Sequence, residues 1–155
     1  MTSNFISEAE FDNIRINNVT LSDIMNTEGD ETQIRELIPA TIIEKHINNG
    51  DRGPLNYSYT YDGFEITFTG NAGTPDHPGL AAFDITNSNW SITIQGKTVT
   101  IGSDIGILGN VVFNDTADGG KSIVYQYCDG CNNFIVVNFN QTTNKITEIG
   151  YIEIP

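Results

Sequence analysis

The two cysteines of the chain form a single Cys-x-x-Cys motif, Cys128-Asp129-Gly130-Cys131. This spacing supports thiol-disulfide exchange where the first thiol lies at a helix N-terminus, which lowers the thiol pKa. Here an alternating, strand-like stretch precedes the motif, and Asp-Gly favours a hairpin turn instead of a helix. We therefore predict that Cys128 and Cys131 are free thiols or a possible disulfide stapling the turn; metal binding is a further alternative, and a thioredoxin-type role is not expected.

Other arrangements that could support catalysis or metal binding are missing from the sequence. His46 and His77 are far apart, and neither has a neighbouring His or Cys to complete a zinc site or a nucleophile motif to complete a triad. The loop with Asp115 and Asp118 lacks the spaced ligands and closing Glu of a calcium loop. We predict no catalytic residues, no metal and no cofactor. An enzyme acting through carboxylates is an open alternative, which would need a deep pocket with two facing carboxylates.

Acidic side chains dominate the charge of the chain. Its 155 residues include 20 Asp and Glu against 7 Lys and Arg, which gives a net charge of −13. Direct nucleic-acid binding is not expected, because affinity for phosphates requires clustered basic side chains. The acidity either keeps a small protein soluble or attracts a basic protein partner, since complementary fields raise association rates.

The length and the apolar content indicate one folded domain, residues 1–155, with 38% hydrophobic residues. No stretch approaches the ~18 apolar residues of a membrane span, so none is predicted. The first ten residues lack the basic and apolar regions of a signal peptide, and we expect a cytoplasmic location. If a signal sequence was removed, a periplasmic or envelope location is expected instead.

An internal repeat is the main organising pattern, with proposed units at residues 12–89 and 90–155. The first unit opens with Ile14-Arg15-Ile16, Val19-Thr20-Leu21 and Ser22-Asp23-Ile24, and the second with Ile92-Thr93-Ile94, Val99-Thr100-Ile101 and Ser103-Asp104-Ile105. Ser22 and Ser103 are predicted to be helix N-caps, because their hydroxyls can accept hydrogen bonds from first-turn amides. A further helix is predicted from Asp30 to Leu37, ended by Pro39.

Each unit continues with three strand-like segments. Residues 57–61 and 64–68 flank Asp62-Gly63, residues 123–127 and 135–139 flank Asp129-Gly130, and closing strands contain Phe83 and Tyr151. Asp-Gly between alternating segments predicts hairpins. The predicted fold class is α+β: two tandem helix-plus-antiparallel-meander units that form one curved antiparallel sheet with helices on one face.

The alternation predicts which face of this sheet is buried. In the first hairpin, Tyr61, Tyr59 and Tyr57 lie opposite Phe64, Ile66 and Phe68, which makes that face the core. The opposite face is polar and open to solvent, as antiparallel sheets permit. Its predicted members are Ser58, Thr60, Glu65, Thr67, Asp84, Thr93 and Gln95.

This order of segments over about residues 12–154 resembles the tandem-repeat fold of the β-lactamase inhibitor protein and of related small bacterial envelope proteins. The resemblance implies that the concave sheet face and the hairpin loops grip another protein. The implied partner-binding residues are the polar face above together with the loop residues Asp51, Asp62 and Asp129. The chain departs from that inhibitor in its cysteines, because both lie in one turn.

The absence of catalytic motifs, the acidic charge and the resemblance together favour one function. We predict a binding protein that neutralises a partner, a bacterial immunity protein or inhibitor that occludes the active site of a basic toxin or enzyme. The alternative is a structural or assembly module of the bacterial cell envelope.

Overall fold

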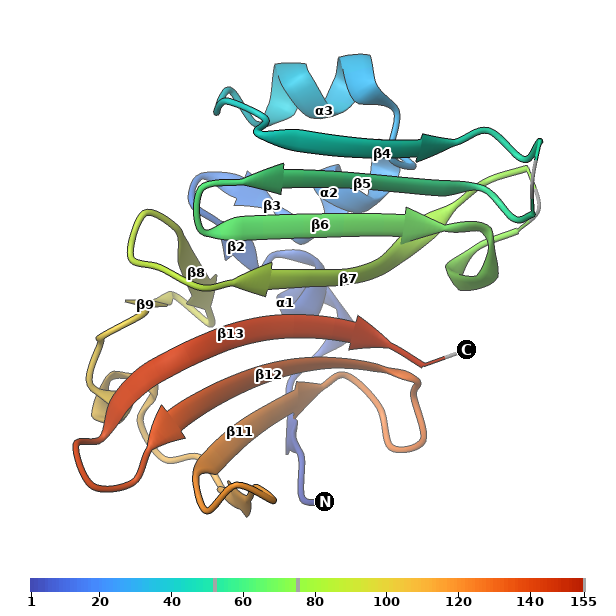
Figure 1. Cartoon of the computed structure of the whole chain (residues 1–155). Coiled ribbons are helices and arrows are strands. Elements are labelled where there is room, and N and C mark those ends of the chain that lie inside the picture. The colour runs from blue at the N-terminus through green and yellow to red at the C-terminus, as the bar shows by residue number, and fades with distance from the viewer. Residues whose placement is uncertain (52, 75, 155) are drawn as a thin grey trace.

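The structure is a computed structural model that describes residues 1–51, 53–74 and 76–154. A large sheet contains β1 (Asn4–Phe5), β4 (Glu44–Asn48), β5 (Asn56–Tyr61), β6 (Phe64–Thr69), β7 (Gly79–Ile85), β10 (Asn114–Asp115), β11 (Lys121–Gln126), β12 (Asn133–Asn140) and β13 (Lys145–Glu153). Its order is β1-β11-β12-β13-β7-β6-β5-β4, with β10 pairing β11 outside this path (Figure 1).

A smaller sheet of order β3-β2-β8-β9 contains β2 (Arg15–Ile16), β3 (Val19–Thr20), β8 (Ser91–Ile94) and β9 (Lys97–Thr100). The helices are α1 (Glu8–Asp12), α2 (Leu21–Asn26) and α3 (Glu31–Leu37), with short 3₁₀ turns η1 (Gly70–Ala72) and η2 (Ile105–Leu108). None of the helices in the described ranges is long and apolar enough to cross a membrane.

The predicted α+β fold of two helix-plus-meander units is wrong. Strands hold 42% of the residues and helices 16%, so the fold is mostly β. The large sheet is also mixed and not purely antiparallel, because β1 runs parallel to β11. The three α-helices all precede β4, and the helix predicted after Ser103 is replaced by η2, a single 3₁₀ turn capped by Asp104.

Glycines explain why the second helix does not form. Gly106 lies inside the predicted helix, and Gly102 and Gly109 lie on either side of it. A glycine inside a helix costs about 1 kcal/mol relative to alanine. The first predicted cap is also displaced, since the Thr20 side chain accepts the hydrogen bond that caps α2 and Ser22 lies inside that helix. The helix predicted from Asp30 to Leu37 is confirmed as α3, with Asp30 as its N-cap.

The predicted register of the first hairpin is confirmed. Tyr57, Tyr59 and Tyr61 of β5 pair with Phe68, Ile66 and Phe64 of β6, and Gly63 takes a positive φ of 86° in the Asp-Gly turn. The alternation places these side chains on one face, where Tyr59 and Ile66 are fully buried. The prediction of a core face and a polar face therefore holds for this hairpin.

The two meanders, β5-β6-β7 and β11-β12-β13, join where β7 pairs with β13. Phe83 lies opposite Tyr151 at this seam, and their rings stack with centroids 5.7 Å apart on the buried face. The helices α1 and α2 and the strands β2 and β3 lie behind the large sheet in Figure 1, α3 stands above its β4 edge, and β8 and β9 lie at the left. No helix or strand of the described residues covers the front face of β4, β5, β6, β7, β13 and β12 in this view.

Candidate functional site

The uncovered face of the large sheet gathers five of the predicted site residues. Ser58 lies opposite Thr67, Thr60 opposite Glu65, and Glu65 opposite Asp84. Their side chains share a face because paired residues of antiparallel strands point to the same side. We call this surface, from β4 to β12, the open face.

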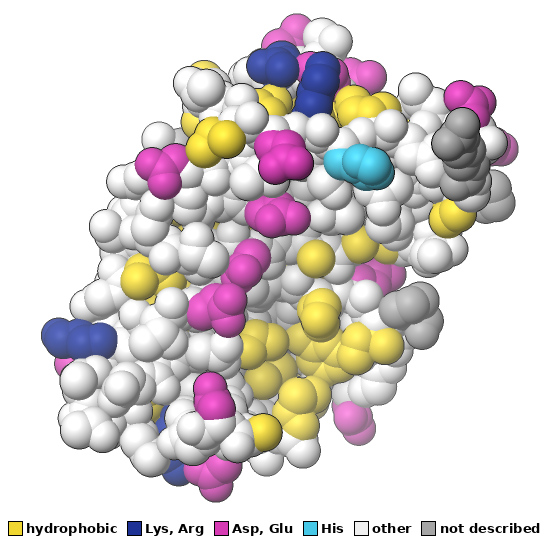
Figure 2. Space-filling model, viewed as in Figure 1, with side chains coloured by type: hydrophobic (Ala, Val, Ile, Leu, Met, Phe, Trp, Pro, Cys, Tyr) yellow, Lys and Arg dark blue, Asp and Glu magenta, His cyan; other side chains and the backbone are white. Residues whose placement is uncertain are grey.

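Four carboxylates cross the open face, and we call Glu44, Glu65, Asp84 and Glu148 the acidic row. Glu44 lies opposite Thr60, and Thr60 opposite Glu65, so the row continues from β4 to β7. Glu148 of β13 lies diagonally beside Asp84, because Asp84 pairs with Gly150. Figure 2 shows this diagonal line of acidic side chains. The four ion pairs among the described residues involve none of these carboxylates.

Partial burial and neighbouring like charges change the ionisation of Asp84. Its burial and the carboxylates of Glu148 and Glu65 raise the pKa of Asp84 to about 6. Burial penalises the charged form, and like charges nearby have the same effect. Asp84 therefore holds a proton more tightly than an isolated aspartate would, and we call Asp84 and Glu148 the carboxyl pair.

Apolar side chains adjoin the acidic row, and we call Ala82, Phe134, Val136 and Ile152 the apolar patch. Ile152 lies opposite both Ala82 and Phe134, while Val136 lies opposite Gly150. Ile152 is 49% exposed, which is a large fraction for an isoleucine within a sheet. Figure 2 shows hydrophobic side chains gathered beside the acidic line. Contiguous exposed apolar surface of this kind is typical of interaction sites.

A groove lies at the boundary between the acidic row and the apolar patch. It encloses about 370 Å³, and its lining includes Asp84, Glu148, Val136, Gly150 and Ile152. Gly150 has no side chain to fill the open face at this point. A Cβ built on Gly150 meets the Phe83 carbonyl oxygen at 3.4 Å, so the space next to this glycine can hold further atoms.

Thr93 and Gln95 do not belong to the open face, contrary to the prediction. Both lie in the small sheet, Thr93 in β8 and Gln95 in the turn that follows. Thr93 shares a hydroxyl hydrogen bond with Thr98, and the Gln95 amide donates to Glu10. The prediction extended the alternation of β7 across residues 86–90, but the chain leaves the large sheet there and pairs β8 with β2.

The three predicted loop residues lie apart from one another. Asp51 and Asp129 are exposed in the β4–β5 and β11–β12 loops, whereas Asp62 lies in the β5–β6 turn, at the opposite ends of the strands (Figure 1). Asp62 has local partners: its carboxylate accepts from the Asn87 and Asn89 amides, and its carbonyl oxygen accepts from the indole of Trp90. Asp62 therefore anchors the residue 87–90 connection.

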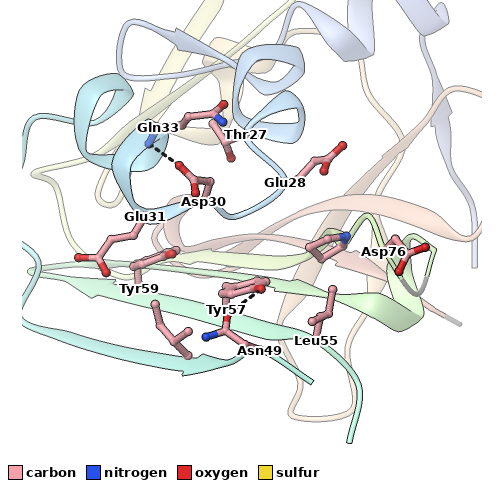
Figure 3. A pocket seen from close by; sticks show the side chains of 12 residues that line it. Thr27, Glu28, Asp30, Glu31, Gln33, Asn49, Leu55, Tyr57, Tyr59 and Asp76 are labelled. Atoms are coloured by element: carbon pink, nitrogen blue, oxygen red, sulfur yellow. Dashed lines mark hydrogen bonds between the residues drawn. The ribbon is translucent and has the colours of Figure 1, made fainter. Parts of the chain in front are cut away.

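A second hollow, of about 500 Å³, lies behind β5 beside α3. Figure 3 shows Glu28, Asp30 and Glu31 on one side of it and the rings of Tyr57 and Tyr59 on the other. We call it the acidic pocket. Three of its carboxylates have partners, since Glu28 pairs with His77, Asp30 caps α3, and Glu31 pairs with Arg35 and Lys45, while Asp76 also lines the pocket. The hydrogen bond to Glu28 raises the pKa of His77.

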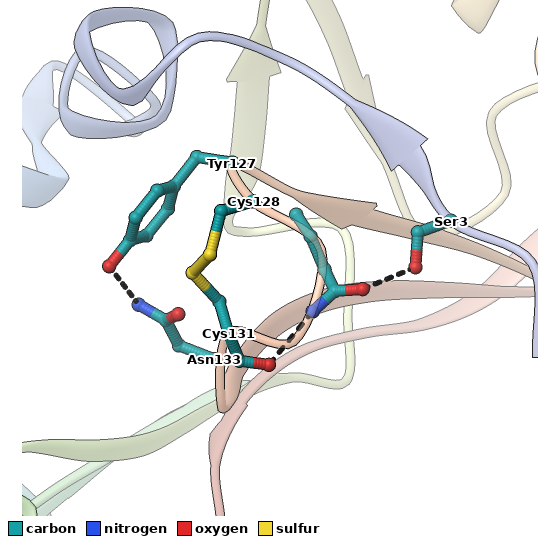
Figure 4. Close-up of a disulfide and its surroundings, with 6 residues drawn as sticks. Ser3, Tyr127, Cys128, Cys131 and Asn133 are labelled. Atoms are coloured by element: carbon teal, nitrogen blue, oxygen red, sulfur yellow. Dashed lines mark hydrogen bonds between the residues drawn. A yellow bond between two sulfur atoms is a disulfide. The ribbon is translucent and has the colours of Figure 1, made fainter.

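Cys128 and Cys131 form a disulfide within the β11–β12 loop (Figure 4). The Gln126 amide donates to the Cys131 carbonyl oxygen, and the Ser3 hydroxyl donates to the Gln126 side-chain oxygen. The disulfide loop is thereby linked to the residue that precedes β1.

Several open-face residues were missed by sequence reasoning. Glu148 and Ile152 alternate with buried residues of β13, and this signal was available in the closing segment around Tyr151. Glu44 lies in β4, where no residue is buried, so alternation gave no signal there. The Asp84–Glu148 pair also supplies the two facing carboxylates that an enzyme would need. Glu148 is exposed on an open sheet face, however, so the pair does not lie in the deep pocket that this alternative requires. No group of residues suited to holding a metal is found in the described ranges.

No family model, curated protein or solved structure matches this chain in the three comparisons made. The resemblance to the tandem-repeat inhibitor fold stays a prediction that rests on the sequence alone.

Proposed function

We propose that this protein binds another protein through the open face and thereby neutralises it, as an immunity protein or inhibitor that occludes the active site of a basic toxin or enzyme. The observation that carries the proposal is the acidic row, which takes part in no ion pair among the described residues, directly beside the apolar patch. An apolar centre with charged surroundings is the usual anatomy of a protein interface.

The size of the open face supports the proposal. Six neighbouring strands, β4 to β12, span about 24 Å at the usual strand spacing of about 4.8 Å. Over a strand length of about 20 Å, this gives a projected area of roughly 500 Å², and protruding side chains enlarge the accessible area. Stable interfaces use about 800 Å² per partner, so the open face and its loops suffice for one.

The charge of the whole chain supports a basic partner. A net charge of −13 attracts a cationic protein at long range and accelerates encounter, with a strong dependence on salt. Carboxylates laid across an active site that binds phosphates would compete with the natural substrate of a nuclease-type toxin.

The experiment that tests this proposal mixes the protein with the product of the neighbouring gene. We expect a complex at micromolar concentration and loss of the partner's activity. A variant with Glu65→Gln and Ile152→Ser should weaken the complex, because one change removes charge and the other removes apolar area. Failure of the unmodified protein to form any complex at that concentration would refute the proposal.

The second candidate is a structural or assembly module of the cell envelope. The Cys128–Cys131 disulfide favours it, because disulfides persist in oxidising compartments and are rare in the cytosol. Fractionation of the native cells distinguishes the candidates, since an envelope module is recovered with the periplasm or membranes and carries the disulfide.

A further inference from the structure

We infer that the groove at Gly150 receives an arginine or lysine side chain of a protein partner, with the aliphatic stem on the apolar patch and the cation at Asp84 and Glu148. This inference rests on the proposed function and states the chemistry by which the open face selects its partner. It also fixes the local sequence expected in that partner, a basic residue flanked by apolar ones.

The lining of the groove is apolar on one side and polar on the other. Ala82, Val136 and Ile152 provide apolar surface on one side, and Asp84, Asn138 and Glu148 provide polar atoms on the other. Long basic side chains match this arrangement, because their methylene stems pack on apolar surface while the charged head reaches polar groups. A wholly apolar side chain would leave the carboxyl pair without a partner, and an acidic one would be repelled.

One carboxylate of the pair is held in place before any partner arrives. The Asn138 amide donates to Glu148 Oε1 at 3.2 Å. The backbone of Asp84 is fixed by pairing of β7 with both β6 and β13, which places this carboxylate beside Glu148. A site with ordered carboxylates loses less conformational entropy when a cation binds, which favours a planar guanidinium that can contact two oxygens.

The two acidic hollows of the molecule differ in how their carboxylates are paired. In the acidic pocket, Glu31 forms ion pairs with Arg35 and Lys45, and Glu28 lies 3.0 Å from the His77 imidazole, while Asp30 and Asp76 are in no ion pair within the part of the chain that the structure describes. On the open face, no ion pair among the described residues reaches Asp84, Glu65 or Glu148. Every carboxylate at the groove is therefore available to a cation from outside, and the groove alone combines such carboxylates with the apolar patch.

Proton binding competes with the partner at this point. Partial burial, together with the carboxylates of Glu148 from β13 and Glu65 from β6, raises the pKa of Asp84 to about 6. An incoming cation stabilises the charged form and displaces the proton. Binding should therefore strengthen as the pH rises through about 6 and weaken below it.

The test uses the ¹⁵N-labelled full chain and the blocked tripeptide acetyl-Val-Arg-Val-amide as probe, followed by amide chemical shifts at pH 7. We expect a dissociation constant on the order of 1 mM, since the probe has few atoms. The shifts should concentrate on β7, β12 and β13. The uncharged peptide with norleucine in place of arginine, which keeps an aliphatic stem, should bind roughly fivefold more weakly, as should the arginine peptide at pH 5.

The matched variants separate a specific site from general attraction to an acidic protein. Asp84→Asn with Glu148→Gln should reduce the affinity for the arginine peptide roughly fivefold, while Glu8→Gln with Glu36→Gln, which removes the same number of charges from exposed helix positions, should leave it unchanged. Equal affinity for the norleucine peptide, equal loss in both variants, or shifts centred on the acidic pocket would each overturn the inference.

Failure of this inference and failure of the proposed function give different results. If the neighbouring gene product forms a complex that Asp84→Asn with Glu148→Gln does not weaken, the inhibitor role stands and the groove chemistry is wrong. If the arginine peptide binds at the groove but no protein complex forms, the groove chemistry stands and the inhibitor role is wrong.

Discussion

Asp84 is the open-face residue at which the electrostatic cost to the free energy of folding is concentrated. It lies opposite Glu65 and beside Glu148, and like charges in these positions destabilise a sheet. A side chain of Ser or Thr would fit the same strand position without that repulsion. An unfavourable local arrangement of this kind is typical of residues that serve binding instead of folding.

We predict that Asp84→Asn stabilises the fold at pH 7. The folded-state pKa of Asp84 is raised from 3.8 to about 6, so the native state holds the proton more tightly than the unfolded chain. The contribution of Asp84 to stability therefore falls as the pH rises from about 4 to about 6 and stays low above that range. Urea unfolding should show a gain for the variant at pH 7 that vanishes below pH 4. The same gain at both pH values, or a loss at pH 7, would contradict the assigned cause, and Glu36→Gln is the control.

Two buried tyrosines of β5 give a matched pair for a second prediction. The Tyr59 hydroxyl donates to the carbonyl oxygen of buried Gly29, whereas the Tyr61 hydroxyl is buried with no hydrogen-bond partner among the described residues. Tyr59→Phe leaves a buried carbonyl unsatisfied and should cost about 1–3 kcal/mol. Tyr61→Phe removes an unpaired hydroxyl and should leave the free energy of unfolding unchanged or slightly higher. Chemical denaturation of both variants checks this, and an equal cost at the two positions would show that the Tyr61 hydroxyl has a partner.

At the scale of the elements, the two Asp-Gly hairpins differ in how they are closed. The β5–β6 turn contains only Asp62 and Gly63, while the β11–β12 loop is longer and contains the Cys128–Cys131 disulfide. The disulfide loop also contacts Gln126, which accepts from Ser3 at the start of the chain. The disulfide thus helps to hold both the β11–β12 hairpin and the attachment of β1.

We predict that Cys128→Ser with Cys131→Ser lowers the free energy of unfolding by at most about 2 kcal/mol, because closing so short a loop removes little entropy from the unfolded chain. Amide hydrogen exchange should accelerate in β1 and in the β11–β12 hairpin. The β5–β6 hairpin, which has no disulfide, is the internal control and should keep its exchange rates. Uniform acceleration throughout the large sheet would instead mean that the disulfide stabilises the whole fold.

The sequence was sufficient for elements with strong local signals. The five alternating residues before Asp62-Gly63 and the five after it determine both hairpin register and buried face, since each residue's neighbour is close in sequence. Asp30 and Pro39 likewise bound α3 through local capping and the missing amide of proline.

Longer-range pairings could not be predicted. Arg15 pairs with Thr93 through a strand of two residues, which carries almost no alternation to detect. This pairing removes Thr93 and Gln95 from the open face. It was not foreseen because the two segments were interpreted as equivalent parts of two repeat units and not as partners. Asp84 and Glu148 could each be assigned to a strand, but their proximity depends on the β7–β13 seam, which joins distant segments.

At the scale of the whole molecule, negative side chains greatly outnumber the positive side chains that could neutralise them. Four ion pairs occur among the described residues, against a net charge of −13. The folded state brings these charges closer together than the unfolded chain does, so mutual repulsion opposes folding.

We predict that sodium chloride raises the melting temperature at pH 7. Between about 0.01 and 1 M salt, the screening length falls from about 30 Å to about 3 Å, which suppresses repulsion between distant carboxylates. A gain on the order of 1 kcal/mol corresponds to a rise of a few degrees for a chain of this size. Repeating the scan near the pI of 4.2, where the net charge is close to zero, should remove most of the rise. A similar rise at both pH values would point to general salt effects and not to charge.

The pairing of β1 with β11 sets the order in which the large sheet can be completed during synthesis. Asn4 and Phe5 leave the ribosome long before their partners Tyr125 and Gln126. The β5–β6 hairpin can form while the nascent chain is still growing, but β1 must stay unpaired until β11 has emerged. Contacts so distant in the chain slow folding, so we expect the docking of β1 to be a late and slow step in completing the large sheet.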